Sequence, residues 1–150
     1  MPNVEFGNEE VKARVEEWTS ELYDEATRQE IEALLANKQV DELLDRFYKT
    51  LAFGTGGLRG KLGAGTNRMN KYIVARATQG LANYVKEHKE KEGPLSAAIT
   101  HDSRHRSREF AETTAEVFAA NGFQVFISPD IRPTPYLSFV VRHLECHTGI

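Results

Sequence analysis

The sequence has little of what cross-linked, secreted or membrane-spanning proteins depend on. Cys146 is the only cysteine among 150 residues, so no disulfide can form within the chain, and a reducing compartment is favoured. Residues 1–18 lack the apolar stretch of a signal peptide. No run approaches the roughly 20 apolar residues that cross a bilayer. These absences predict a cytoplasmic protein.

A strong charge of either sign is also lacking. The net charge is −3 and the pI is near 6.0, which gives no general attraction for nucleic acid or anionic lipid. Arg104, Arg106 and Arg108 stand close together, but Asp102 and Glu109 flank them and no aromatic residues are interleaved. Neither nucleic acid nor a membrane is therefore predicted as a partner.

The first third of the chain, residues 1–50, is strongly charged and has helical periodicity. Asn8 can cap a first helix. The apolar stripe of that helix is Val11, Val15, Trp18 and Leu22. Thr27 and Glu30 have the spacing of a capping box, and residues 40–48 predict a third helix. We predict a helical extension without chemistry of its own, with Trp18 in its core rather than on a partner surface.

The rest of the chain alternates between strand-like and helix-like segments. Helices are predicted over 71–90, over 107–121 and from Pro135 onward, where Thr134 can cap. Buried strands are predicted over 95–100 and 123–128 and from 147 onward. Each connection is long enough for a helix. We therefore predict an α/β fold, with a mostly parallel or mixed sheet and helices on both faces.

A glycine-rich segment, FGTGGLRG (53–60), precedes the first of these helices and is predicted to form short strands joined by a loop. Gly56 and Gly57 let backbone N–H groups approach an anion, Thr55 adds a hydroxyl, and Arg59 adds a forked cation suited to phosphate oxygens. A glycine-rich hairpin with a surface arginine is the alternative interpretation. The spacing matches neither a Walker A loop nor a dinucleotide fingerprint.

Two loops follow the carboxyl ends of predicted strands, where ligands bind in such sheets. In the loop after Thr100, Asp102 and Arg104 form either a buried ion pair that shapes the mouth of a site or part of a solvated charged turn. The loop after Ser128 is interpreted as a strand-to-helix turn stiffened by prolines.

No metal site is predicted in the chain. His101 and His105 are four residues apart, as in zinc-binding helices, but His101 directly follows a strand and Asp102 stands where a glutamate is expected. Cys146 is predicted to be a buried thiol rather than a nucleophile.

Four segments occur together in one order: FGTGGLRG, GTNRMN (65–70), ITHDSRHRS (99–107) and RPTP (132–135). In this order and spacing the chain resembles domain I, the N-terminal domain, of the α-D-phosphohexomutases, closest to their phosphoglucomutase and phosphopentomutase branch. The resemblance covers residues 47–150. Gly56 stands where many members have Ser or Ala.

The resemblance implies a phosphosugar mutase of four domains. Such enzymes interconvert sugar 1-phosphates and 6-phosphates (or 5-phosphates) through a phosphoserine and a sugar bisphosphate, with Mg²⁺ held mainly by domain II. It implies that Arg59 contacts the phosphoryl group, that Thr55, Gly56 and Gly57 surround it, and that Asp102 and Arg104 support the site. Hexose or pentose phosphates and the remaining domains of the same protein are the implied partners.

The motif around the phosphoserine should follow the strand that begins with HTGI (147–150), and the sequence ends there. We therefore predict a helical extension (1–50) and a domain I (51–150) truncated before the serine, inactive as a fragment. Two alternatives remain: a non-catalytic module that binds phosphate or sugar phosphate, and an interaction domain that uses the helices of residues 1–50.

Overall fold

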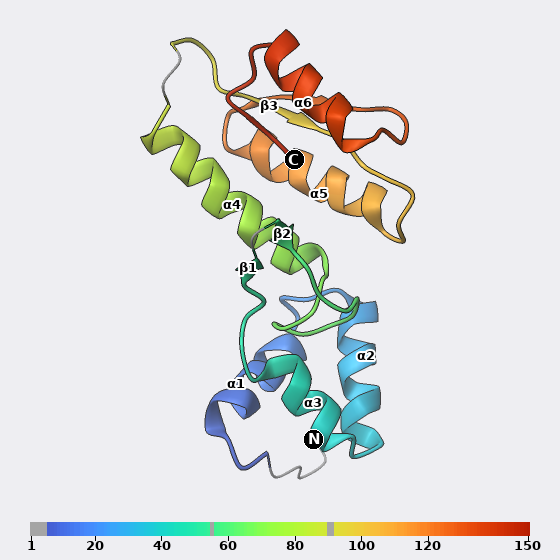
Figure 1. Ribbon diagram of the computed structural model, residues 1–150. Coiled ribbons are helices and arrows are strands. Elements are labelled where there is room, and N and C mark those ends of the chain that lie inside the picture. The colour runs from blue at the N-terminus through green and yellow to red at the C-terminus, as the bar shows by residue number, and fades with distance from the viewer. Residues whose placement is uncertain (1–5, 55, 90–91) are drawn as a thin grey trace. The chain divides into compact units, whose positions relative to one another are not determined.

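The computed structural model describes residues 6–54, 56–89 and 92–150 (Figure 1). The helices formed by these residues are α1 (Glu9–Trp18), α2 (Glu25–Ala36), α3 (Val40–Phe47), α4 (Lys71–Glu87), α5 (Ser107–Ala120) and α6 (Thr134–His143). The strands are β1 (Phe53–Gly54), β2 (Gly57–Leu58), β3 (Ser96–Ile99), β4 (Gln124–Ile127) and β5 (Thr148–Gly149). The chain divides into two compact units, Met1–Ile73 and Val74–Ile150, and each has its own buried core.

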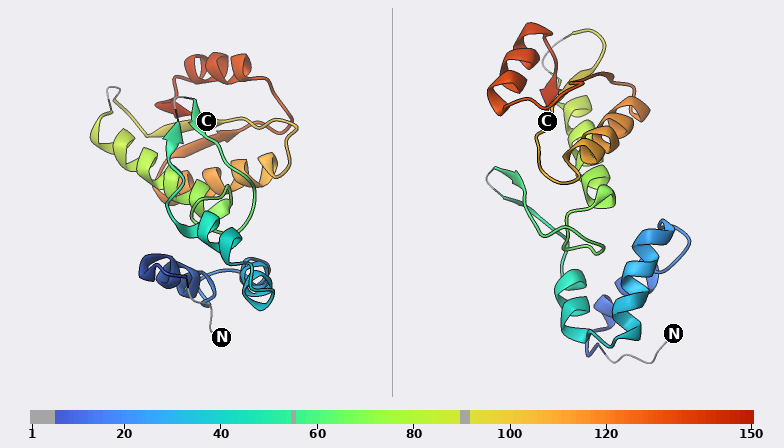
Figure 2. Two further views of the ribbon diagram at one scale, coloured as in Figure 1. Left: turned by 60° about the horizontal axis from the view of Figure 1, so that its bottom comes forward. Right: turned by 90° about the vertical axis from the view of Figure 1, so that its right-hand side faces the viewer.

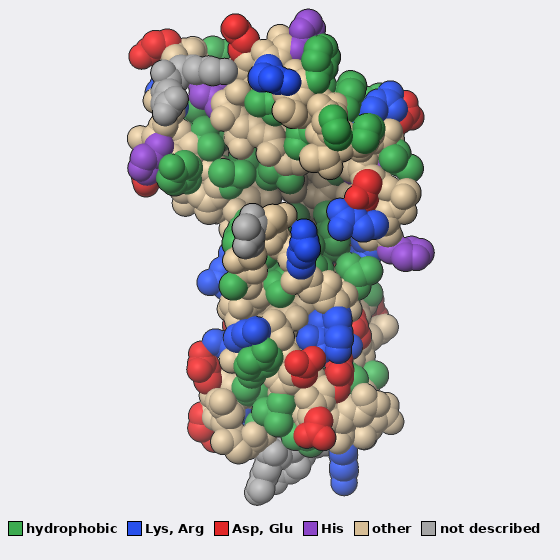
Figure 3. Space-filling view, in the orientation of Figure 1, with side chains coloured by type: hydrophobic (Ala, Val, Ile, Leu, Met, Phe, Trp, Pro, Cys, Tyr) green, Lys and Arg blue, Asp and Glu red, His purple; other side chains and the backbone are tan. Residues whose placement is uncertain are grey.

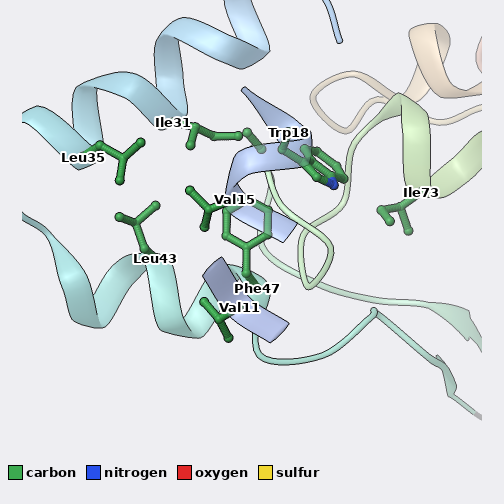
Figure 4. Packing of buried hydrophobic residues seen from close by; sticks show 9 residues of the cluster. Val11, Val15, Trp18, Ile31, Leu35, Leu43, Phe47 and Ile73 are labelled. Atoms are coloured by element: carbon green, nitrogen blue, oxygen red, sulfur yellow. The ribbon is translucent and has the colours of Figure 1, made fainter. Parts of the chain in front are cut away.

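Helices α1, α2 and α3 enclose the core of the first unit (Figure 4). Asn8 caps α1 as predicted, because its Oδ1 accepts hydrogen bonds from the backbone N–H groups of Glu10 and Val11. Trp18 is 3% exposed, which confirms its prediction as a core residue. Its ring stacks on Tyr23 and meets Phe47 edge-on. The apolar stripe of α1 therefore packs into the core of this unit.

Two predictions about these helices are wrong. Leu22 is 78% exposed, because α1 ends at Trp18 and Leu22 lies in the turn that follows. Helix α2 begins one turn before the predicted capping box at Thr27 and Glu30. Asp24 is its N-cap, and the carboxylate of Asp24 accepts from both the backbone N–H and the hydroxyl of Thr27. Asp24 therefore supplies the side-chain oxygen that was expected from Thr27.

The main sheet of the second unit is parallel, with the order β4-β3-β5 among the described strands. Helix α6 covers one face, while α5 and most of α4 cover the other (Figures 1 and 2). Strand β3 is buried along its whole length, as expected of a central strand between two helical layers. The predicted α/β fold is confirmed, with helices on both faces of a parallel sheet and a helical segment before it.

Helix α6 starts at Thr134, so Thr134 is not its cap. Pro133 occupies the N-cap position and no side chain caps this end. Leu137 and Val141 lie against β5 at Gly149, whereas Phe139 and Leu144 are exposed.

Hydrophobic side chains are visible on the surface of the second unit in Figure 3. On α4, Tyr84 is 60% exposed and its ring stacks on His88.

Candidate functional site

The glycine-rich segment forms the antiparallel hairpin that its composition predicts. Phe53 pairs with Leu58 and Gly54 with Gly57. Gly57 has a φ of +111°, a conformation that L-residues rarely adopt. A glycine is therefore required at this position, where β2 begins. Thr55 lies outside the described residues, and its predicted place around a phosphoryl group stays a prediction. The hairpin exposes backbone at Gly54 and Gly56.

Arg59 directly follows β2 and is exposed. Its Nη2 lies beside Gly56: a Cβ built on Gly56 would be 3.2 Å from that nitrogen. Within residues 6–54, 56–89 and 92–150, the guanidinium has neither a hydrogen bond nor an ion pair. By contrast, Arg46, Arg68, Arg104, Arg106 and Arg108 all bind carboxylates. Arg59 is therefore a charged fork held at a glycine turn with its donors available to an anion.

Below the hairpin, residues 63–70 form a tightly bonded loop, here called the base loop. The backbone N–H of Leu51, before β1, donates to the carbonyl of Thr66 over 2.8 Å. The backbone N–H of Met69 donates to the carbonyl of Lys61, after β2, also over 2.8 Å. The base loop thus fastens both arms of the hairpin.

The base loop also completes the carboxyl end of α3, whose last carbonyls have no partners within the helix. Asn67 donates from its backbone to the carbonyl of Arg46 and from its side chain to that of Asp45. The hydroxyl of Thr66 donates to the carbonyl of Lys49 over 2.7 Å. Gly65 passes so near α3 that a Cβ there would lie 2.9 Å from the backbone oxygen of Arg46.

Arg68, the cation of the base loop, has a side chain that is only 3% exposed. Its Nη2 binds Asp45 at 2.7 Å and Glu42 at 3.1 Å. The hydrogen bond from Arg68 is the main cause that lowers the pKa of the Asp45 carboxyl, and the bond from Arg46 is the main cause that lowers that of Glu42. The arginine of GTNRMN therefore joins the base loop to α3 and is not presented to solvent.

In the second unit, the two loops at the carboxyl ends of β3 and β4 are joined to each other. The backbone N–H of Arg132 donates to the carbonyl of His101 over 3.0 Å. Arg108 of α5 donates to the carbonyls of Ser128 and Pro129 at 3.3 and 3.1 Å. The two loops that follow the carboxyl ends of β3 and β4 therefore lie side by side.

Asp102 and Arg104 form an ion pair, but it is not buried. The Oδ2 of Asp102 lies 2.7 Å from the Nε of Arg104, and the two side chains are 42% and 85% exposed. The backbone N–H of Arg104, which donates to Oδ1, is the main cause that keeps the pKa of Asp102 below its usual range. The pair is part of a solvated turn at the start of α5, and Ser107, the first residue of α5, also hydrogen-bonds to Asp102.

Metal ligands do not gather in the described part of the chain, where no group of three or more His, Cys, Asp or Glu side chains could hold an ion. Cys146 is 2% exposed, which confirms the prediction that its thiol is buried. No helix among the described residues is long and apolar enough to cross a membrane.

The structure brings the predicted residues together in two groups, each within one unit. Gly56, Gly57 and Arg59 share the hairpin, and Asp102 and Arg104 share the loop after β3. Sequence reasoning missed Glu30 and Arg46, whose side chains reach the base loop. No local pattern predicts these contacts, because Ala64 lies 34 residues after Glu30 and 18 residues after Arg46.

The chain was compared with protein families, with individual proteins and with solved structures. Residues 50–150 match the family described as phosphoglucomutase/phosphomannomutase, alpha/beta/alpha domain I. The matched segment includes the hairpin, the base loop and the whole parallel sheet. No solved structure matches the chain significantly.

Individual relatives extend the match toward the N-terminus. A probable phosphoribomutase of Schizosaccharomyces pombe is 36% identical over 136 residues, or 91% of this chain and 23% of that protein. A phosphoglucomutase of Staphylococcus haemolyticus is 41% identical over 69% of this chain and 18% of its own length. The phosphopentomutase of Mus musculus is 33% identical over 83% and 21%.

The chain spans about a fifth of the length of these relatives. A match of 136 residues cannot fit within residues 50–150, so the similarity to the yeast protein reaches into the N-terminal helices.

Proposed function

This chain belongs to the phosphoglucomutase/phosphomannomutase family through its α/β/α domain I, and from that premise we propose that the protein carrying it is a phosphosugar mutase. The reaction we propose interconverts a sugar 1-phosphate with its 6-phosphate, or with its 5-phosphate in a pentose. It proceeds through a phosphoserine and a bisphosphate intermediate. Relatives named phosphoglucomutase, phosphoribomutase and phosphopentomutase support hexose and pentose phosphates as the substrate class.

The observation that carries the proposal is the exposed guanidinium of Arg59 beside the glycine turn, which has no hydrogen bond or ion pair with the residues that the structure describes. Phosphoryl transfer depends mainly on positioning and on neutralising the charge of the equatorial oxygens. A planar guanidinium offers paired donors that fit a phosphate, and we propose that backbone N–H groups of Gly56 and Gly57 add neutral donors. In the proposed site Arg59 holds the phosphoryl group, and Thr55 contributes its hydroxyl.

Other parts of the reaction fall to segments beyond this chain. The phosphoserine is proposed to lie after Ile150, and the 150-residue chain alone is proposed to be inactive. The described residues offer no cluster that fits Mg²⁺, so no step in this chain is assigned to a metal. Mg²⁺ is proposed to bind mainly in domain II. Asp102 and Arg104 are proposed to support the site by ordering the loop after β3.

The test is an assay of the protein that carries this chain, with Mg²⁺ and a trace of the sugar bisphosphate, on glucose 1-phosphate and on ribose 1-phosphate. Arg59→Ala is expected to lower kcat/KM by on the order of a hundredfold or more, as when one donor to a developing charge is removed. Arg142→Ala is the matched control, because Arg142 is exposed on α6 and its side chain, among the described residues, bonds only to the carbonyl of Ser138 in its own helix. It should leave turnover unchanged.

The outcomes separate the alternatives. Turnover by the unsubstituted protein that survives Arg59→Ala would remove Arg59 from the site. Lack of turnover on hexose and pentose phosphates, together with phosphate binding that Arg59→Ala abolishes, would favour the non-catalytic binding module. Partner binding that survives Arg59→Ala would favour an interaction domain.

A further inference from the structure

Two side chains from the N-terminal helices grip the backbone of the base loop. Glu30 of α2 accepts a hydrogen bond at Oε2 from the N–H of Ala64, over 3.2 Å. Arg46 of α3 donates from Nη1 to the carbonyl oxygen of Ala64, over 3.0 Å. The same Nη1 binds Oε1 of Glu30, so one ion pair holds both the backbone N–H and the backbone carbonyl of a single residue, Ala64. We call Glu30 and Arg46 the clamp.

Arg46 is the more buried residue of the clamp, whereas the side chain of Glu30 is 41% exposed. The side chain of Arg46 is 12% exposed, and its Nε binds Glu42 at 2.8 Å. A Cβ on Gly63 would lie 3.0 Å from Oε1 of Glu30 and 3.1 Å from Nη1 of Arg46. Ala64 itself is 3% exposed. Burial acts to lower the pKa of Arg46, but the hydrogen bonds that Arg46 donates to Glu30 and Glu42 raise this pKa overall, so Arg46 keeps its positive charge.

The clamp is coupled to Arg59 by a short path through the backbone. Next to Ala64, the N–H of Gly63 donates to the carbonyl of Met69, and the N–H of Met69 donates to that of Lys61. Lys61 is two residues from Arg59. On the other arm, Leu51 is bonded to Thr66, and its side chain fills the space beside Gly60. A displacement of Ala64 therefore moves both arms of the hairpin.

We propose that Glu30 and Arg46 are positioning residues, which hold the base loop so that the hairpin presents Arg59 to the phosphoryl group. Both residues precede the segment that matches the family domain, which starts at residue 50. The helices of residues 1–50 are thereby assigned a role in the site. This inference rests on the proposed function for the use of Arg59, but the clamp itself is tested without substrate.

The test is hydrogen-exchange mass spectrometry on the protein that carries this chain, without ligand. Glu30→Gln keeps the shape of the side chain and removes its charge. It is expected to raise exchange in peptides covering residues 51–69 on the order of tenfold, the effect of losing a charge-assisted hydrogen bond. Glu10→Gln is the matched control, because Glu10 pairs with Arg14 within α1 and touches no part of the base loop.

Arg46→Lys is the second variant, since a lysine keeps the charge but lacks the fork that binds Glu30, Glu42 and Ala64 together. If Glu30→Gln unfolds the helices, the exchange measured in Arg46→Lys tests the clamp instead. Raised exchange in the hairpin with unchanged exchange in α1 supports the clamp. Raised exchange confined to the helices, or equal effects of Glu30→Gln and Glu10→Gln on the hairpin, overturns it. The proposed function is tested separately, because its failure would appear as a lack of turnover by the unsubstituted protein.

Discussion

At the scale of single residues, two glycines in the second unit differ in what surrounds the missing side chain. A Cβ on Gly149 of β5 would lie 2.4 Å from Cγ2 of Val141 and 3.1 Å from Cδ1 of Leu137. A Cβ on Gly80, in the middle of α4, would meet no atom within 4 Å. Gly149 therefore permits the close contact of α6 with the sheet, whereas Gly80 contributes only flexibility to a helix.

These surroundings predict opposite effects of one substitution. Gly149→Ala is expected to destabilise the protein by about 1–3 kcal/mol, because α6 must move away from β5. Gly80→Ala is expected to stabilise it by about 0.5–1 kcal/mol, because alanine costs less entropy in a helix. Urea denaturation of both variants measures the two changes, and a loss of stability in Gly80→Ala would contradict the second.

At the scale of elements, the start of α2 is fixed by a residue far along the chain. The hydroxyl of Tyr72 accepts the backbone N–H of Asp24 and donates to its carboxylate, both over 2.7 Å. Lys71 lies 3.0 Å from the same carboxylate. Burial acts to raise the pKa of Asp24, but the bonds from Tyr72, Thr27 and Lys71 outweigh it and hold the pKa well below its usual range. The first turn of α2 is thus tied to the start of α4.

A carboxylate with a lowered pKa stabilises the folded state above its unfolded pKa of about 3.9, and that stability is lost as the pH falls toward the folded value. Asp24→Asn keeps a capping oxygen but removes the charge. It is expected to cost on the order of 1 kcal/mol at pH 7 and less at pH 3. Denaturation at both pH values tests this, with Glu32→Gln as the control on an exposed position of α2. An equal cost at both pH values would refute a role for the charge.

At the scale of the whole molecule, the two units have separate cores that share no buried residue among those described. Phe47 is fully buried among the N-terminal helices, and Phe118 is fully buried between α5 and the sheet. Ion pairs such as Arg46–Glu30 and Arg14–Glu10 lie near the surface of the first unit, where both signs of charge appear together in Figure 3.

Separate cores predict separate losses of stability. Phe47→Ala and Phe118→Ala are each expected to cost about 3–5 kcal/mol within the unit that holds the ring. Hydrogen exchange should therefore rise mainly in residues 6–73 for Phe47→Ala and mainly in residues 74–150 for Phe118→Ala. A uniform rise across the chain in either variant would mean that the units unfold as one.

Much of the fold and part of the site could be predicted from the sequence. The hairpin of residues 53–58, the strand at 96–99 and the helix at 107–120 follow from glycine content, apolar runs and periodicity, which act between neighbours in the chain. The motifs that include Arg59 and Arg68 indicated the family, which the match over residues 50–150 bears out. The predicted roles of Arg59, Thr55, Gly56, Gly57, Asp102 and Arg104 stay predictions.

Tertiary structure alone decided what depends on partners distant in sequence. Asp24 rather than Thr27 caps α2, with Tyr72 bonded to it from 48 residues away. The side chains of Asp102 and Arg104 are 42% and 85% exposed, a property that their local sequence left open. Glu30 and Arg46 meet at Ala64 because two helices and a loop fold together. Local pattern sets which elements form, but burial and charge pairing depend on what folds against them, and no local pattern carries that information.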